Sequence, residues 1–196
     1  ISGSETDLSK CGGVLFGCGI GQSELAENTL QKLIAECEKP LVIDADGINL
    51  LSKHIDLLKT AKCPVVLTPH AGEMARLTGL TAEYINANRV KVALDFAKEQ
   101  GVTLLLKGKD TVIASSKGEV FINPTGTSAL ATAGSGDVLS GIITAFLSQG
   151  ADPFKSAVMG ALIHGLSGDF AEKDLTNRCV TASDIIEYLP EAFKEC

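Results

Sequence analysis

Hydrophobic and polar positions alternate along this chain in blocks that predict buried strands, most of them followed by amphipathic helices. Short apolar runs bounded by Gly, Pro or charged residues are typical of strands that are covered on both faces. We expect parallel strands within Gly12–Gly21, Pro40–Gly47, Cys63–Glu73 and Val102–Leu106, and then an antiparallel pair at Thr111–Ser115 and Glu119–Asn123 with Gly118 in its turn.

Apolar residues spaced three and four positions apart predict the helices. Ser23, Asp152-Pro153 and Thr181 are expected to begin three of them, and Gly101 to end another. The predicted helices are Ser23–Cys37, a short helix after Asp46, Glu73–Thr78, Glu83–Gln100, one from Gly134 to Gly150, one from Asp152 to about Glu172, and a last helix from Thr181 that carries Ile185, Ile186 and Leu189. The residues predicted to face inward are Leu25, Leu30, Leu33 and Ile34 in the first helix and Ile85, Val90, Ala93, Leu94 and Ala97 in the fourth.

This order of elements indicates an α/β fold. Strands that alternate with helices form a mainly parallel sheet, with helices on both faces in a three-layer arrangement. The chain contains no internal repeat, low-complexity segment or linker. We therefore expect residues 1–196 to form a single domain.

Composition narrows the classes of partner. The 196 residues are 45% hydrophobic, which suffices for a large core, and the net charge is −7. Nucleic acids and anionic membranes require a basic surface, so we expect neither as a partner. Six scattered cysteines form no CxxC pair and indicate a reducing compartment, which we take to be the cytoplasm. The sequence shows no transmembrane run and no signal peptide.

A Gly-, Ser- and Thr-rich loop runs into an apolar helix at Gly134-Ser135-Gly136-Asp137. The glycines let the backbone approach a ligand, and the helix turns its free N–H groups and positive dipole end toward the loop. Such a place is suited to a phosphate. Asp137 adds a carboxylate, which is useful for taking a proton from a hydroxyl that is being phosphorylated. The alternative is that Asp137 only caps the helix.

Two predicted strands end in polar residues that a parallel sheet would bring to one edge. Asp44 and Asp46 end the first, and His70 ends the second. Ligands bind beyond the carboxyl ends of such strands. Asp44 closes a hydrophobic run and needs a partner if buried, so it is the better site candidate, whereas Asp46 is expected to cap the next helix. A single His is most often structural, but the position of His70 beside Asp44 and Asp137 favours a role in the site.

The segment Lys107–Thr111 follows another predicted strand. A Lys at a strand end can reach a phosphate, and a simple turn with solvated charges is the alternative, although one turn can do both. Gly17-x-Gly19-x-Gly21 lacks the spacing of a dinucleotide fingerprint and indicates only that backbone approaches a ligand. His54 and His164 lack comparable support, and we interpret His164 as a packing residue.

Four segments together resemble one family, the ADP/ATP-dependent NAD(P)H-hydrate dehydratases, which have a ribokinase-like fold. The similarity runs in order from about Gly12 to the last helix. The segments that carry it are Val42–Asn49 (VIDADGIN), Leu67–Leu77 (LTPHAGEMARL), Leu106–Thr111 (LKGKDT) and Asn123–Gly141 (NPTGTSALATAGSGDVLSG).

The resemblance implies nucleotide-dependent removal of water from hydrated NADH or NADPH. Asp137 would be the catalytic residue and would contact the hydrate together with Gly19, His70 and Asp44. ADP or ATP is the implied co-substrate, and Mg²⁺ is expected, with ligands that the sequence does not assign. The residues implied to bind the nucleotide are Lys107, Gly108, Lys109, Asp110, Thr111, Gly134, Ser135 and Gly136.

The resemblance carries further expectations and two departures. Members of the family usually have Pro in place of Cys18 and of Ala71, and they carry strands and helices upstream, so we expect the N-terminal portion of the domain to be missing here. A homo-oligomer is implied, often a tetramer, and the apolar Phe154–Phe170 helix is a candidate interface. An NAD(P)H-hydrate epimerase, fused or separate, is an expected partner. The preferences between ADP and ATP, and between the two hydrates, stay open.

Two other functions stay open. A ribokinase-like kinase of a hydroxymethylpyrimidine or thiazole alcohol would use Asp137 as the same base and stop one step earlier. A non-catalytic nucleotide-binding subunit would not need the Asp137 carboxylate. The stretch from His70 to Glu73, together with Lys107-Gly108, favours the dehydratase.

Overall fold

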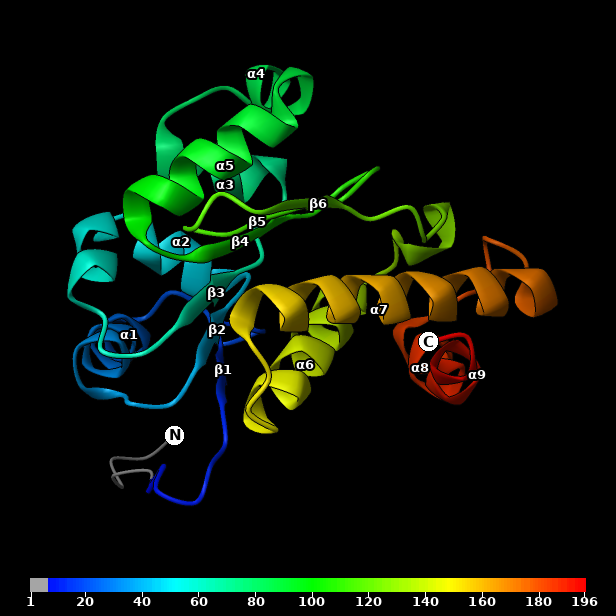
Figure 1. The fold of residues 1–196 in the computed structure, drawn as a ribbon, viewed down its shortest axis with the longest axis horizontal. Helices are drawn as coiled ribbons and strands as arrows, with labels where there is room; N and C mark the ends of the chain where they lie inside the picture. Colours follow the sequence, from blue (N-terminus) through cyan, green and yellow to red (C-terminus); the bar gives the residue numbers. More distant parts are fainter. Residues whose placement is uncertain (1–6) are drawn as a thin grey trace.

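The computed structural model describes residues 7–196, which contain one six-stranded sheet with its strands in chain order (Figure 1). The first four strands are parallel, and the last two are antiparallel to their neighbours, as predicted. The strands are β1 (Val14–Phe16), β2 (Leu41–Ile43), β3 (Val65–Leu67), β4 (Thr103–Leu106), β5 (Val112–Ala114) and β6 (Val120–Ile122).

Helices lie on both faces of this sheet, which confirms the three-layer expectation (Figure 1). In β2 the side chains of Leu41 and Ile43 enter one core and that of Val42 the other, because successive side chains of a strand point to opposite faces. The helices of the first core are α1 (Glu24–Glu36), α2 (Asp46–Leu51), α3 (Ala71–Thr78), α4 (Ala82–Ala87) and α5 (Arg89–Gln100), with the 3₁₀ segment η1 (Ile55–Thr60). On the other side lie η2 (Ser128–Leu130), α6 (Ser135–Ser148), α7 (Pro153–Leu175), α8 (Ala182–Glu187) and α9 (Leu189–Lys194).

Local capping chemistry sets several helix ends as predicted. The Ser23 side chain caps α1, and Asp152 accepts hydrogen bonds from two backbone N–H groups at the start of α7. Thr181 forms a capping box with Asp184 at the start of α8. Gly101 ends α5 in the left-handed conformation.

The predicted Glu83–Gln100 helix is wrong in one respect, because the chain breaks at Asn88 into α4 and α5. The Asn88 side chain donates to the Tyr84 carbonyl at 2.9 Å, which competes with helical backbone bonding. Ala93 and Ala97 of α5 are buried as predicted. Val90, beside the break, is exposed, and Val92 and Phe96 are buried in addition.

Two more predictions about the helices are wrong. Leu25 is exposed, and Ala26 takes the inward position in α1. The last helix is divided into α8 and α9 around Tyr188, because Pro190 begins a new first turn. Of the apolar residues that this helix was expected to carry, Ile185 is buried and Ile186 is exposed. No helix within residues 7–196 is long and apolar enough to span a membrane.

Candidate active site

The loop before α6 reaches its helix through Gly134, which has a φ of 83° and serves as the N-cap. A left-handed residue here costs little only for glycine. The first turn of α6 holds Ser135, Gly136 and Asp137, and a Cβ at Gly136 would lie 3.4 Å from the Lys107 Nζ. The helix N-terminus and a lysine ammonium therefore meet at one point, which is an arrangement suited to an anion.

Asp44 has the partners that its burial requires. Its carboxylate, only 1% exposed, accepts hydrogen bonds from the Lys107 Nζ at 2.7 Å and from the Ser140 Oγ at 2.6 Å. Ser140, which sequence reasoning missed, lies one helical turn after Gly136 and so on the same face of α6. Asp44 therefore holds Lys107 in place. Both of its oxygens are already paired, and its predicted direct contact with the substrate stays a prediction.

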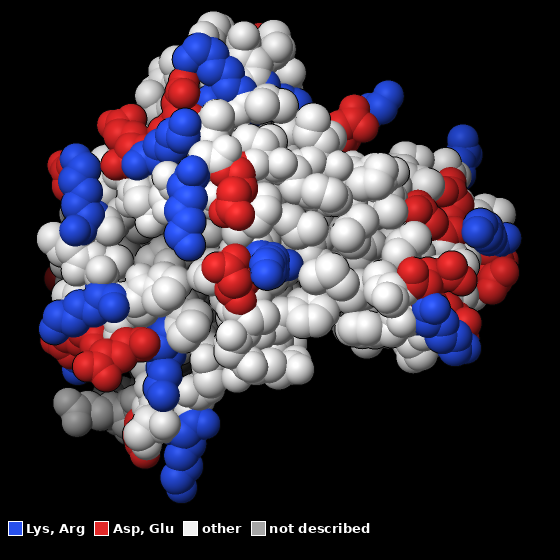
Figure 2. Space-filling model, in the orientation of Figure 1, with Lys and Arg blue, Asp and Glu red and all other residues white. Residues whose placement is uncertain are grey.

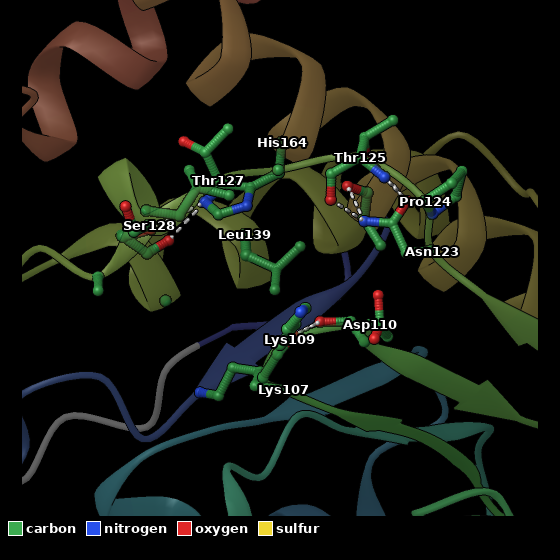
Figure 3. A pocket seen from close by; sticks show the side chains of 18 residues that line it. Lys107, Lys109, Asp110, Asn123, Pro124, Thr125, Thr127, Ser128, Leu139 and His164 are labelled. Carbon is green, nitrogen blue, oxygen red and sulfur yellow. Dashed lines mark hydrogen bonds between the residues drawn. The ribbon is translucent and has the colours of Figure 1, made fainter. Parts of the chain in front are cut away.

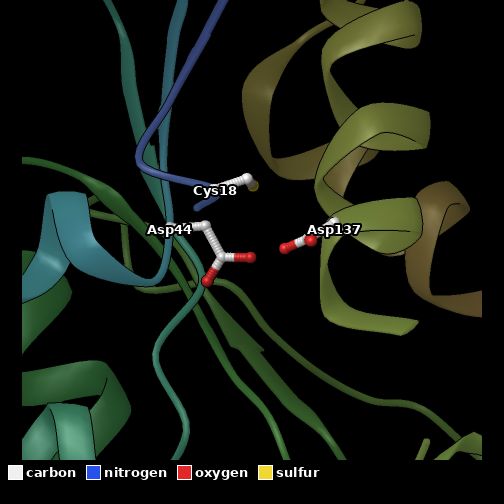
Figure 4. Close-up of side chains that lie close together, drawn as sticks. All are labelled: Cys18, Asp44 and Asp137. Carbon is white, nitrogen blue, oxygen red and sulfur yellow. The ribbon is translucent and has the colours of Figure 1, made fainter. Parts of the chain in front are cut away.

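Asp137 lies across a gap from Asp44, and the thiol of Cys18 lies between the elements that carry them (Figure 4). The two carboxylates and the sulfur each offer one atom within 4.8 Å of the others. Burial, helped by the hydrogen bond to Asp137, raises the pKa of the Cys18 thiol to about 12. The thiol is therefore protonated at neutral pH and acts as a hydrogen-bond donor to Asp137.

His70 lies at the predicted sheet edge and also caps a helix. Its Nδ1 accepts from the N–H groups of Gly72 at 2.9 Å and Glu73 at 3.3 Å, and the Glu73 carboxylate accepts from the His70 N–H at 2.8 Å. A backbone bond from Lys107 to the Pro69 carbonyl ties this turn to the end of β4. The His70 side chain is 56% exposed, so the ring is accessible to a ligand while Nδ1 holds the helix.

A cavity of about 530 Å³ opens beside the α6 N-terminus (Figure 3). The whole of Lys107–Thr111 lines it, with Ser135 and Gly136 and with the loop Asn123–Ser128. The two segments predicted to bind a nucleotide therefore face one space, and only Gly134 of the predicted set is absent from the lining. Lys107–Thr111 is also the connection between the antiparallel strands β4 and β5, as the turn interpretation expects, and its binding of a nucleotide stays a prediction.

His164 is buried, as a packing residue would be, but it also belongs to this cavity. Its Nε2 lies 3.0 Å from the Ser135 carbonyl oxygen and 3.1 Å from the Ser135 Oγ. The carbonyl can only accept, so Nε2 carries the proton. Burial lowers the pKa of His164 to about 4, and the ring is neutral at pH 7. Sequence reasoning missed the contact between His164 and Ser135. The signal that could have indicated it is a polar side chain within an apolar helix.

The loop after β1 corrects one prediction, that Asp46 caps α2, and the approach of its backbone to a ligand stays a prediction. At Gly17 the backbone approaches the chain itself, since a Cβ there would lie 1.8 Å from the Asp44 carbonyl oxygen. Asp46 does not cap α2, whose N-cap is Ala45; its carboxylate accepts from the Gly21 N–H at 2.9 Å. Gly19 lies in the exposed part of the same loop, with nothing within 4 Å of the position of its absent Cβ.

Comparison with known proteins agrees with this geometry. A profile of the NAD(P)H-hydrate dehydratase family matches residues 2–191. The chain belongs to this family. Its sequence is 43% identical over 175 residues to the bifunctional NAD(P)H-hydrate repair enzyme Nnr of Moorella thermoacetica, covering 89% of this chain and 33% of that protein. It is 42% identical over 158 residues to the ADP-dependent (S)-NAD(P)H-hydrate dehydratase of Neisseria meningitidis, covering 79% of this chain and 53% of that one.

A solved structure of the family has the same fold. The crystal structure of the ADP/ATP-dependent NAD(P)H-hydrate dehydratase from Bacillus subtilis, co-crystallised with ATP/Mg²⁺, superposes with a TM-score of 0.82 at 30% identity. The match covers 94% of this chain and 64% of that structure. The ribokinase-like expectation is thus confirmed, and the chain spans between a third and two thirds of the length of these three dehydratase-family relatives.

Proposed function

We propose that this chain uses ADP or ATP to remove water from hydrated NADH or NADPH. The observation that carries the proposal is that the Lys107 ammonium lies at the α6 N-terminus beside one large cavity, while the Asp137 carboxylate of the same helical turn lies close to Asp44, the partner of Lys107. Family membership supports the same reaction. We place the nucleotide along Lys107–Thr111 and Ser135–Gly136, and the hydrate on the opposite side of Asp137, near Gly19 and His70.

The phosphoryl group is held by positive charge fixed before the reaction. The Lys107 Nζ is kept at Gly136 by its 2.7 Å bond to Asp44, so no reorganisation is needed as negative charge shifts. The backbone N–H groups of the first turn of α6 add the helix dipole. Together these groups stabilise the terminal phosphoryl during in-line transfer.

Asp137 provides the base for the transfer. Its carboxylate takes the proton from the C6 hydroxyl of the hydrated ring, and that oxygen attacks the terminal phosphorus, releasing AMP from ADP or ADP from ATP. The C6–O bond then breaks with phosphate as the leaving group, and the ring nitrogen supplies the electron pair. Loss of a proton from the adjacent C5 restores the double bond. Phosphate leaves far more easily than hydroxide, which is the reason for consuming a nucleotide.

Mg²⁺ fits as a companion of the nucleotide rather than as an ion held by the protein alone. Of the three ligand-type side chains in Figure 4, Asp44 is occupied by Lys107 and Ser140, and the Cys18 thiol is a soft ligand that suits Mg²⁺ poorly. Asp137 is the remaining oxygen ligand, and Mg²⁺ commonly binds one carboxylate together with substrate phosphates. When bound, the ion neutralises phosphate charge.

The test is recovery of NADH from its hydrate. The chain is incubated with NADH hydrate, Mg²⁺ and either ADP or ATP, and the dihydronicotinamide absorbance is followed. Asp137→Asn is expected to abolish recovery, whereas Asp152→Asn, which keeps a capping side chain far from the site, is the matched control and is expected to be active. No recovery by the folded parent chain, or full activity of Asp137→Asn, would refute the proposal.

The same assay separates the two other functions. A kinase of a pyrimidine or thiazole alcohol would form a stable phosphate ester from such an alcohol and leave the hydrate unchanged. A binding subunit would bind nucleotide and release no phosphate with any of these substrates. The Asp137 carboxylate, which follows the cavity-lining Gly136 in the first turn of α6, favours catalysis, because binding an anion is weakened by a nearby negative charge.

We further propose that the chain forms one domain and self-associates through the outer face of α7 and the adjacent edge of β6. Ser156–Gly168 contains no Asp, Glu, Lys or Arg, and Ile122 on the edge strand is 50% exposed. Figure 2 shows a largely white area between the acidic and basic pair at the centre of this face and the charged side chains at its right end. Light scattering of Ile122→Glu should show a smaller assembly than the parent; an unchanged mass would contradict this interface.

An epimerase that interconverts the two forms of the hydrate is the proposed partner activity, in the cytoplasm. The Moorella relative is bifunctional, and this chain covers only 33% of it. All six cysteines are free thiols, which suits a reducing compartment. Addition of an epimerase to the assay should raise the yield of NADH from a mixture of epimers above the fraction reached without it.

A further inference from the structure

The turn that carries Lys107 begins directly after β4 ends at Leu106. Beyond the paired residues of β3 and β4, the Lys107 N–H donates to the Pro69 carbonyl at 2.8 Å, within an isolated parallel bridge between His70 and Lys107. Leu106, one residue earlier, is fully buried, and its carbonyl accepts a hydrogen bond from the Arg89 Nη2 at 2.7 Å. Arg89, at the start of α5, therefore binds the backbone at the end of β4.

The same guanidinium supports the backbone of the turn. Gly108 has a φ of 148°, which other residues rarely adopt, and a Cβ there would lie 3.0 to 3.2 Å from three guanidinium atoms of Arg89. The plane of Arg89 thus lies directly against the Gly108 backbone. A glycine is required at this position both by its conformation and by the contact.

Arg89 bears a cost that an ordinary surface arginine does not. Burial lowers the pKa of its guanidinium, with some opposition from the charge of Asp110, and its Nε is buried without a hydrogen-bond partner. Its contact with Asn86 is long, at 3.4 Å. The short bond to Leu106 is the strongest interaction that offsets this cost.

We propose that Arg89 is a positioning residue for the nucleotide site, one that holds Lys107–Gly108 so that the Lys107 ammonium stays at the α6 N-terminus. The inference rests on the proposed function in that the nucleotide binds along Lys107–Thr111. Arg89 is not among the residues that line the cavity, so it acts through the turn and not by touching the nucleotide.

The test measures ADP and ATP affinity by titration calorimetry with Mg²⁺, well below the melting temperature. Arg89→Gln is expected to weaken binding about ten-fold, which corresponds to about 1.4 kcal/mol. Arg89→Lys keeps the charge and can reach Leu106 but lacks the planar group, so an intermediate loss is expected, and this variant carries the test if Arg89→Gln does not fold. Lys91→Gln removes an exposed charge from the same helix and should bind like the parent chain.

Hydrogen exchange of the nucleotide-free protein gives an independent result. Amides of residues 107–111 should exchange faster in Arg89→Gln and not in Lys91→Gln. Gly108→Ala also crowds the guanidinium, so its effect on affinity should be smaller in the Arg89→Gln background than in the parent chain. Parent-like nucleotide affinity of Arg89→Gln, or of Arg89→Lys where Arg89→Gln does not fold, would overturn the inference, and so would parent-like exchange of residues 107–111 in that variant.

The outcomes also separate this inference from the proposed reaction. If Arg89→Gln binds nucleotide as well as the parent while the parent restores NADH, the inference fails and the reaction stands. If nucleotide affinity falls as expected but the parent restores no NADH, Arg89 retains its positioning role and the reaction is refuted. If the parent binds no nucleotide, both fail.

Discussion

Replacement of Asp44 by Asn tests how much of the site is held together by one buried carboxylate. Asp44 is 1% exposed and accepts from Lys107 at 2.7 Å and from Ser140 at 2.6 Å. The asparagine amide is neutral and offers an NH₂ group in place of one acceptor oxygen. At least one of the two donors, the Lys107 ammonium or the Ser140 hydroxyl, therefore loses its partner. Lys107 is 20% exposed, and Glu73 at 4.0 Å compensates in part.

These facts set the expected magnitude. Breaking a buried ion pair from one side costs about 3–5 kcal/mol, and the partial exposure of Lys107 and the presence of Glu73 place Asp44→Asn at the low end, near about 3 kcal/mol. For a domain of this size that corresponds to a melting temperature lower by roughly 6–12 °C. Nucleotide affinity should fall as well, since Lys107 is then no longer fixed at Gly136.

The assay is urea denaturation, with Asp56→Asn as the matched control. Asp56 pairs with Lys59 at 3.0 Å, but both side chains are more than half exposed, so no measurable change is expected. The double variant Asp44→Asn/Lys107→Met removes both charges and should lose less stability than the sum of the single changes. If Asp44→Asn is as stable as Asp56→Asn, or if the double variant is additive, the interpretation of this pair as a coupled unit is refuted.

Three further predictions concern single positions. Gly165→Ala should destabilise the protein by more than about 2 kcal/mol, because the new Cβ would lie 2.0 Å from a threonine hydroxyl. Gly141→Ala, whose Cβ would have no atom within 4 Å, should stabilise the protein by about 0.5–1 kcal/mol. Thermal denaturation of the two variants tests both expectations. Mapping of iodoacetamide adducts by mass spectrometry at pH 8 should show slow modification of Cys18, whose pKa is raised to about 12, relative to exposed Cys179; equal rates would contradict the assigned thiol. Folding lowers the pKa of His164 from 6.5 to about 4, so between these pH values the unfolded chain binds a proton that the folded chain does not. The stability that the neutral ring contributes is therefore complete above pH 6.5 and is lost as the pH falls toward 4. Urea denaturation of His164→Gln should show a shallower loss of stability over this range than the parent.

Much of the architecture follows from local sequence patterns. Short apolar runs predicted the sheet, and Ser23, Asp152 and Thr181 marked helix starts, because a capping side chain bonds to backbone two or three residues away. The loop Gly134–Asp137 also indicated an anion site for a local reason, namely the meeting of glycines with a helix N-terminus. Such features depend on neighbours in the chain, so they can be predicted without the fold.

Contacts between distant segments could be found only in the tertiary structure. Asp44 meets Lys107 and Ser140, which lie 63 and 96 residues further along the chain, and no spacing rule links residues so far apart. The sequence interpretation of His164 as a packing residue leaves out its bond to Ser135, because that bond joins two different helices. The same holds for Arg89, whose role depends on where β4 ends beside it. Burial and pairing energies are properties of the folded surroundings of a residue. The sequence therefore indicates which residues could be functional, and the three-dimensional contacts show which of them lie together.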